Sequence, residues 1–364
     1  MPTIGIFLAL LVVMYLVRWV YSKACLQNLD VQLYMSANTA TEGDIVTLTE
    51  VLTNSKWLPL PWVSVKFRTG RELKFTTSPI ASDAYYRNDL FHILMHQKIT
   101  RRLPFECAKR GYYAIDGLEL TGWDVLMENK YIRQFPCDIR LTVLPRTIAT
   151  PEVDHLCSLV YGQLRTRHPI NPDPFSFRGI REYYPSDPVK TINFKASAKA
   201  QNLMVNVWDF SNARRVAILL DTERHTVWHN ETLEERAIKI AASVAEKMVA
   251  IGTPISFTTN GRSVISGNAT NIYEGYGAQQ LHTILEALAY IDLANQAIAP
   301  ITNNIEDILL EGHHDPEYWL ISAYYSAKVE EAYHELKHAG VRVVWIMPDP
   351  RPQGTDICDQ IIFV

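Results

Sequence analysis

The residues that most directly resemble catalytic machinery are His334, Glu335 and His338, which read H-E-x-x-H. On a helix this spacing places two imidazoles on one face, where they can bind zinc, and the glutamate can act as a general base. The helix ends at Gly340, and no glutamate follows Glu335 to supply a third ligand. We therefore expect a solvated helix face here rather than a zinc peptidase, and a polar loop at His313–Asp315.

A second candidate position is the loop that follows Asp221. Val216–Asp221 is an apolar run that ends in an acid, which is typical of a parallel strand buried on both faces. Sheets of this kind bind ligands at the carboxyl ends of their strands. The loop after Asp221 is therefore the first place to look for chemistry.

Composition and charge exclude several function classes. Hydrophobic residues make up 48% of the 364 residues and charged residues 20%, so most of the chain should fold. The net charge of -4 indicates no general attraction to nucleic acid. The five cysteines are scattered and include no C-x-x-C pair, so neither a zinc ribbon nor a disulfide framework is indicated.

Residues 4–21 form an apolar segment interrupted only by Arg18. About 18 helical residues span roughly 27 Å, close to the hydrocarbon thickness of a bilayer. Nothing basic precedes the segment and no good small-x-small cleavage site follows it, so we expect an uncleaved anchor rather than a signal peptide. Arg18 and Lys23 follow the span, and the positive-inside rule then places the rest of the chain in the cytoplasm.

From Leu29 to about Pro145, short alternating runs separated by turn residues predict a β-sandwich or barrel. Thr41–Asp44 is a predicted turn, and Pro59 and Pro61 suit a sheet edge. Lys109–Tyr113 is either a phosphate-binding turn or, as we prefer, a hairpin corner with an exposed basic pair. The expected strands are Val31–Tyr34, Ile45–Leu52, Trp62–Phe67, Ile93–Thr100 and Arg140–Val143.

Between the β region and the Val216–Asp221 strand, the pattern is mixed. Thr147–Asp173 reads as a crossover with a short helix near Val153–Tyr161, and it closes with three prolines in six residues. Asp187-Pro188 is a helix-start signal, after which Ile192, Ala196 and Lys199 would share a face. Leu203–Phe210 alternates like a half-buried strand.

The remainder alternates helix and strand, which predicts a mainly parallel sheet covered by helices on both faces. The expected helices are Glu231–Ile251, Gln279–Leu293 and Ala327–His338, the last closed by Gly340. Besides Val216–Asp221, the expected strands are Ile255–Thr258, Tyr318–Ala323, Val341–Met347 and Ile361–Val364.

The stretch Phe177–Lys199 carries a family resemblance. Its segments read G-I-R-E-Y, P-S-D, I-N-F and K-A-S-A-K, and they resemble the L-R-E-Y, P-G-D, I-x-W and A-S-A-R pattern of the bacterial "domain of unknown function 58" family. The resemblance covers nearly the whole chain. The residues that carry it are Arg178, Gly179, Arg181, Glu182, Tyr183, Asp187, Asn193, Lys195, Ser197 and Lys199, and the chain departs with Ser186 for glycine, Phe194 for tryptophan and Lys199 for arginine.

The resemblance implies an α+β multidomain protein. Its expected parts are a transmembrane anchor (1–23), a β-sandwich (24–146), a crossover with the signature motif (147–212) and a von Willebrand factor A-like α/β domain (213–364). Members of the family are not known as enzymes, and they are often paired with MoxR-type AAA+ ATPases in assembly or activation of client proteins. They often carry two N-terminal spans, whereas one is visible here.

A von Willebrand factor A-like domain often binds Mg²⁺ through D-x-S-x-S after its first strand, because hard oxygen ligands suit a hard cation. Here Asp221 is present, but Glu223 and His225 replace both serines, and Arg224 adds a positive charge. We therefore expect a degenerate site in which Asp221 caps a turn or helix. Metal-dependent ligand binding stays as the alternative function.

The charges of Phe177–Lys199 leave two alternatives open. They form either a basic surface that recognises an acidic partner or, through Arg181 and Glu182, an internal ion-pair network. Our leading expectation is a membrane-anchored, non-enzymatic scaffold with protein partners, no cofactor, no small-molecule substrate and no nucleic acid.

Overall fold

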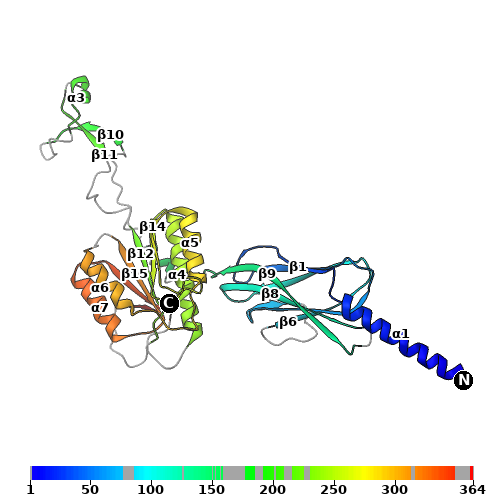
Figure 1. Cartoon of the computed structure of the whole chain (residues 1–364). Helices are drawn as coiled ribbons and strands as arrows, with labels where there is room; N and C mark the ends of the chain where they lie inside the picture. The colour runs from blue at the N-terminus through cyan, green and yellow to red at the C-terminus, as the bar shows by residue number, and fades with distance from the viewer. Residues whose placement is uncertain are drawn as a thin grey trace. The chain divides into compact units, whose positions relative to one another are not determined.

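The structure is a computed structural model, and it divides into two compact units. The first unit comprises Met1–Arg146, Ser263–Ser266 and Leu285–Ile291, and the second comprises the other residues. Figure 1 shows the elements of both. The residues that the structure describes are 2–76, 86–124, 127–149, 151, 153–155, 157–158, 177–184, 192–200, 202–208, 215–224, 230–312, 316–348 and 361–363.

The first unit begins with helix α1, Pro2–Ala24 (dark blue in Figure 1). Its segment Ile4–Ala24 is long and apolar enough to cross a membrane. Most of its apolar side chains are exposed, whereas Tyr21 near its end is buried. The predicted apolar helix is therefore present, with its C-terminal end packed on the body of this unit.

Two sheets form the body of the first unit. The first sheet has the order β1 (Leu29–Met35), β3 (Ile45–Asn54), β7 (Lys98–Cys107), β5 (Leu73–Phe75), and all its pairs are antiparallel. The second has the order β2 (Thr39–Thr41), β9 (Lys130–Leu144), β8 (Gly111–Trp123), β4 (Leu60–Arg68), β6 (Tyr86–Ile93), with β2 parallel to β9.

Alternate residues of the two sheets point inward and share one apolar core, so this unit is the predicted β-sandwich. The first sheet contributes residues such as Leu48 and Phe105, and the second contributes Val65 and Leu120. The predicted turn at Thr41–Asp44 is present as well, since the Thr41 amide donates to the Asp44 carboxylate over 2.8 Å.

The predicted strand Ile93–Thr100 is wrong. β6 ends at Ile93 and β7 begins at Lys98, so a hairpin turn interrupts the run. The side-chain amide of Asn54 donates to the Leu94 carbonyl over 2.8 Å, and His96 has a φ of 50°. The turn lacks glycine and proline, and for this reason its apolar residues read as a continuation of the strand.

Two details of the β region also differ from expectation. Pro61 lies in β4, which has a neighbour on each side, and not at a sheet edge. A register shift between Leu60 and Val63 interrupts the pairing there, so the missing N–H of proline is tolerated. The corner at Lys109–Tyr113 is present, but Arg110 is buried rather than exposed, and it donates to the carbonyl of Leu288 over 2.7 Å.

The second unit contains a six-stranded sheet. Its order is β14 (Thr270–Gly275), β13 (Ile255–Thr259), β12 (Val216–Asp221), β15 (Glu317–Ser322), β16 (Val343–Met347), β17 (Ile361–Phe363). All pairs are parallel except β13 with β14. Every residue of β12 is buried, which confirms the prediction of a central strand covered on both faces.

Helices cover both faces of this sheet, as predicted. α4 (Glu231–Ile251) and α5 (Gly277–Ala289) lie on one face, and α6 (Ile301–Glu311) and α7 (Ala327–His338) lie on the other (Figure 1). The expected bounds of α4 and α7 are met, whereas α5 ends four residues before the predicted Leu293. α6 and the antiparallel strand β14 were not predicted.

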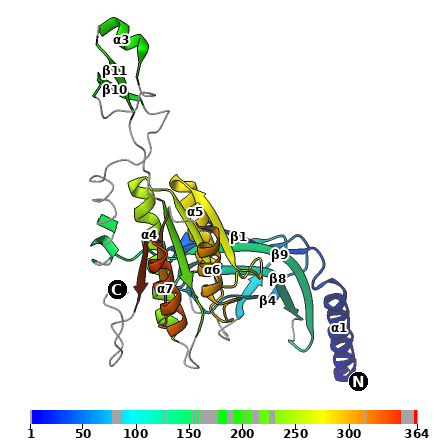
Figure 2. The same ribbon diagram turned by 90° about the vertical axis from the view of Figure 1, so that its left-hand side faces the viewer.

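The signature stretch and the residues after it form a small element. β10 (Phe177–Glu182) pairs antiparallel with β11 (Met204–Trp208), and α3 (Phe194–Ala200) lies beside them (Figure 2). β11 confirms the predicted strand. The predicted helix start at Asp187-Pro188 lies outside the described residues, and Ile192 is not helical but bridges Val205. Residues 151, 153–155 and 157–158 are helical, within or next to the predicted crossover helix.

Candidate functional site

The carboxyl end of β12 is a topological switch point. β13, the next strand in the chain, pairs with one side of β12, and β15 pairs with the other. Open α/β sheets bind ligands in the crevice at such a point. Asp221 is the last residue of β12 and lies opposite Ser322 of β15. The position predicted from sequence is therefore the one at which this architecture places a ligand site.

Side chains of the protein itself occupy this switch point. Asp221 is 2% exposed and Asn260 is 1% exposed. The Asp221 Oδ1 atom accepts from the Glu223 amide over 2.9 Å and from the Asn260 side-chain amide over 2.7 Å. The Asn260 Oδ1 atom accepts from the Thr222 amide over 2.9 Å. Asp221 thus caps the turn that follows it, and Asn260 ties that turn to the end of β13.

The next residue of this loop, Arg224, is held by a buried acid. Its Nε and Nη2 atoms lie 2.8 Å and 3.1 Å from the two carboxylate oxygens of Glu234 in the first turn of α4. The Tyr324 hydroxyl donates to the same carboxylate over 3.1 Å. The hydrogen bond with Glu234 raises the pKa of Arg224, and burial raises the pKa of Tyr324. This bidentate pair holds Arg224 against the first turn of α4.

These residues do not fit a magnesium ion. Asp221 already accepts two hydrogen bonds on one oxygen, and Arg224 brings a cation to the same loop. The Ser322 hydroxyl accepts from the indole N–H of Trp345 over 2.7 Å. Within the ranges described above, no three His, Cys, Asp or Glu residues are grouped so as to hold a metal. His225 lies outside those ranges.

Magnesium is expected to leave the stability of the protein unchanged. Millimolar Mg²⁺ should not shift the melting temperature of the full chain, whereas a site that binds only the folded state would raise it. Asp221→Ala should destabilise the protein by about 1–3 kcal/mol with or without Mg²⁺, because the Asn260 amide loses a buried acceptor. A magnesium-dependent rise in melting temperature that Asp221→Ala abolishes would contradict this reading.

The H-E-x-x-H residues lie on the outer face of α7. The buried side chains of this helix are Val329, Ala332, Tyr333 and Leu336, which pack on the sheet. Glu335 and His338 are exposed, and the His334 ring contacts Tyr333 edge-on with centroids 5.6 Å apart. The arrangement is that of a solvated helix face, and no third ligand lies near it among the described residues.

A concave region of about 760 Å³ lies on the face of the sheet that α6 and α7 cover. Its lining combines strand residues such as Thr258 and Asn271 with residues of α6 such as Asp307. An ion pair between Arg215 and Glu274, 3.4 Å long, lies in it. The polar lining includes no cluster of titratable groups arranged for acid–base or nucleophilic chemistry.

The signature residues divide into an internal group and an exposed group. Internally, the Asn193 Oδ1 atom accepts from the Ala196 amide over 2.9 Å and so caps α3. The Ser197 hydroxyl donates to the Asn193 carbonyl and accepts from the Met204 amide, each over 2.8 Å. Asn193 and Ser197 therefore join α3 to β11.

The other described signature residues, together with the neighbouring Tyr184 and Phe194, present an aromatic and basic surface. Phe194 is 73% exposed and Tyr184 60% exposed. Arg181 is exposed, donates to the Glu182 carbonyl over 2.9 Å and lies over the Tyr184 ring. Glu182, Lys195 and Lys199 are exposed, Gly179 and Tyr183 are half-buried, the side chain of Arg178 is not described, and Asp187 lies outside the described residues.

A cluster of charged side chains inside the sandwich was not predicted from the sequence. Asp89 of β6 bonds Arg87, also of β6, over 2.5 Å and Arg101 of β7 over 2.9 Å. Glu50 of β3 lies opposite Arg101 in register and is buried, and neither of its carboxylate oxygens has a hydrogen-bond partner. Burial, and then the charge of Asp89, raises the pKa of Glu50 to about 8. The sequence did contain one sign of this cluster: Glu50 occupies an inward-facing position of a strand in which inward and outward residues alternate.

Comparison with known proteins gives no family. No family model matches the chain. No curated protein matches it either. Solved structures that resemble it include a cohesin module of a family 33 glycoside hydrolase from Clostridium perfringens, which is 6% identical with a TM-score of 0.23 over 33% of this chain and 97% of that one.

Two further structures are similar to the same low degree. The CARDB domain of the PF1109 protein from Pyrococcus furiosus, in complex with di-metal ions, is 12% identical with a TM-score of 0.20 over 32% of this chain and 94% of that one. The sporulation control protein Spo0M from Bacillus subtilis is 10% identical with a TM-score of 0.20 over 38% and 56%. Scores of this size carry no argument about this chain.

Proposed function

We propose that this chain is a membrane-anchored, non-enzymatic adaptor that binds other proteins. One observation carries the proposal: the switch point, where such a sheet would bind a ligand, is filled by the buried Asp221–Asn260 network. A reaction or a metal-dependent capture would need polar groups that are free to meet a ligand there. Asp221 and Asn260 instead use these groups to hold Thr222 and Glu223, the residues that follow β12.

The signature element supports a role in protein recognition. Asn193 and Ser197 fix α3 on β11, while Tyr184, Phe194 and Arg181 stay exposed around them. Aromatic and arginine side chains are the types that dominate the binding energy of protein interfaces. With Lys195 and Lys199 nearby in the chain, the surface suits a partner with acidic residues.

The identity of the partner rests on the family resemblance. In that family the α/β part resembles a von Willebrand factor A domain, and it is paired with a MoxR-type AAA+ ATPase and its client proteins. The central β12, with parallel strands on both sides, supports such a domain. Apolar α1, with the basic residue Lys23 in its last turn, supports a single span with the two units on the cytoplasmic side.

Co-purification tests this proposal. The full chain, tagged and expressed together with a MoxR-type ATPase from the same cells, is expected to recover that ATPase from detergent-solubilised membranes. In a second arrangement the tagged chain is expressed with a catalytically inactive ATPase variant that still binds nucleotide, because such a variant prolongs transient complexes. Recovery of neither the ATPase nor a client protein in both arrangements would refute the proposal.

A further inference from the structure

The end of α1 is part of the β-sandwich. Val20, Tyr21 and Ala24 pack against the sandwich core, and the Tyr21 hydroxyl donates to the Pro59 carbonyl over 2.8 Å. The ammonium group of Lys56 donates to the carbonyls of Cys25 and, over 2.8 Å, Gln27, the residues that follow the helix. These contacts fix the direction of α1 relative to the sandwich.

The membrane-length segment of α1 therefore runs into the sandwich without a linker. The segment of 21 residues, Ile4–Ala24, includes the three side chains that pack on the core. Just before these residues in the helix, Arg18 pairs with Glu128 of the β8–β9 turn over 3.0 Å. At 1.5 Å per residue, Arg18 lies roughly 9 Å before Ala24 along the helix axis. The β8–β9 turn thus reaches back along the part of α1 that would enter a bilayer.

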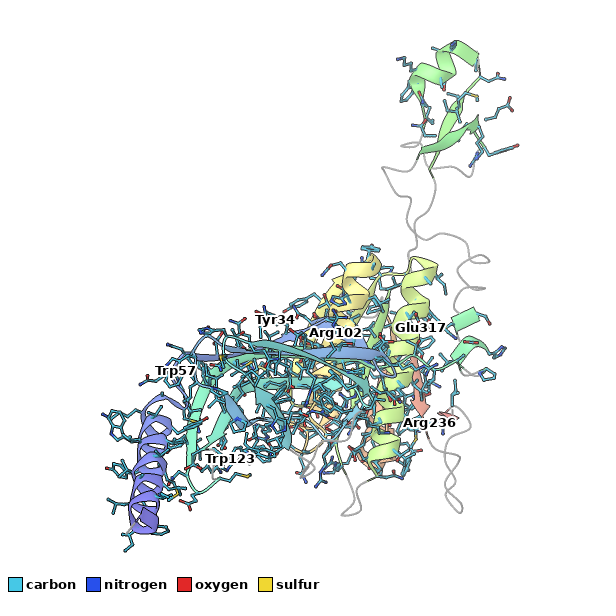
Figure 3. The ribbon with its side chains drawn as sticks, turned by 90° about the vertical axis from the view of Figure 1, so that its right-hand side faces the viewer. Tyr34, Trp57, Arg102, Trp123, Arg236 and Glu317 are labelled. Atoms are coloured by element: carbon cyan, nitrogen blue, oxygen red, sulfur yellow. The ribbon has the colours of Figure 1, made fainter. Side chains whose placement is uncertain are left out.

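Two more turns lie at this end of the sandwich. The turn between β3 and β4 contains Lys56, whose carbonyl accepts from the His96 amide over 3.1 Å. His96 belongs to the turn between β6 and β7, and the Asn54 amide group donates to the Leu94 carbonyl of the same turn. Figure 3 shows Trp57 and Trp123 at the end of the sandwich next to α1.

The tips of all three turns expose large apolar side chains. Trp57 is 64% exposed, Leu94 63%, Met95 58% and Met127 54%. Soluble proteins can expose such residues singly, but four at one end, beside an apolar helix, form a patch. The exposed cations Lys23, Lys130 and Arg133 lie at the same end of this unit. Apolar tips with tryptophan and flanking cations are the composition that a bilayer interface favours.

We propose that these three turns insert into the headgroup region of the bilayer around α1. The sandwich is then seated on the membrane, which means that its turns contact the bilayer directly and α1 is not its only attachment. This inference rests on the proposed anchoring by α1. Four contacts, α1 and the three turns, would then fix the tilt of the sandwich relative to the membrane plane. A single helix joined by a flexible linker would leave this tilt variable.

Depth measurements on spin labels test the proposal. One cysteine for the spin label is introduced at a time, as Trp57→Cys, Met95→Cys or Met127→Cys, into full-length protein in lipid nanodiscs. Cys137 and Cys358 are replaced by serine, and the buried Cys25, Cys107 and Cys157 are kept. We expect the ratio of oxygen to aqueous nickel-chelate accessibility to be at least threefold higher at these sites than at Ile45→Cys. Ile45 is an equally apolar, exposed residue at the opposite end of β3.

A label at Val13→Cys separates the two claims. If Val13 is in lipid while positions 57, 95 and 127 match the Ile45 control, α1 spans the membrane and the seating of the sandwich is refuted. If Val13 is aqueous as well, the anchoring itself fails and the inference fails with it. Lipid-side ratios at Val13 and at the three turns, with an aqueous ratio at Ile45, are the predicted result.

Discussion

Glu50→Gln is expected to stabilise the sandwich at neutral and alkaline pH and to leave it nearly unchanged at pH 5. Glu50 is buried between the sheets, and its pKa of about 8 means that the folded state holds it protonated at pH 7. Glutamine reproduces the neutral side chain without a charge to bury. The gain at pH 8 and above should be on the order of 3–5 kcal/mol.

The direction follows from proton linkage. The folded-state pKa of Glu50 is above its unfolded value. At pH values between these two pKa values, the folded state therefore binds more protons than the unfolded state. Its contribution to stability is fully present below about pH 4.5 and is lost as the pH rises through about 8. The wild-type free energy of unfolding should therefore fall across this window, and the fall should be smaller in Glu50→Gln.

Hydrogen exchange of the β3 and β7 amides at several pH values, corrected for intrinsic rates, measures the opening free energy of these strands. Glu106→Gln is the matched control, because Glu106 lies on β7 but is exposed. Equal pH dependence in wild type and Glu50→Gln would contradict the account of this cluster.

Glu234→Ala is the substitution with the second largest expected effect. Glu234 binds Arg224 with both carboxylate oxygens and accepts from Tyr324, and its side chain is almost fully buried. Removing one partner of a buried ion pair leaves an uncompensated charge, which costs about 3 kcal/mol or more. Arg224 should then lose its fixed position against α4, and the second unit should unfold at lower temperature.

Two variants make this prediction specific. The double variant Arg224→Leu with Glu234→Leu should recover most of the lost stability, because no unpaired charge is left. Glu246→Ala on the exposed face of α4 should change the melting temperature little. A double variant that is as unstable as Glu234→Ala would show that the pair acts through packing and not through its charges.

Much of the second unit could be predicted because apolar residues recur with clear periods. Val216–Asp221 is continuous in apolar residues, and Glu231–Ile251 keeps one apolar face over its whole length, so both have their predicted bounds. β14 was missed because Thr270–Gly275 is an edge strand with no buried residue, which leaves no periodic apolar signal.

Only one of the two main residues of the site at the end of β12 could be predicted from the sequence. Asp221 could be singled out by its place after an apolar strand. Asn260 could not, because it is 39 positions away and only the parallel register of β12 and β13 brings the two side chains to 2.7 Å. Arg110 was misplaced for a similar reason: its acceptors lie 178 or more positions later in the chain.

The proposed adaptor function is tested most directly by measuring how a MoxR-type ATPase binds to the exposed surface that contains Arg181, Lys195 and Lys199. Full-length protein in nanodiscs would be compared with a variant carrying Arg181→Ala, Lys195→Ala and Lys199→Ala, using biolayer interferometry. The control replaces three exposed cations elsewhere in the second unit, Arg236, Arg262 and Lys328, by alanine. We predict at least tenfold weaker binding for the signature variant and unchanged binding for the control. Equal affinity of all three proteins, or no binding by wild type, would contradict the account.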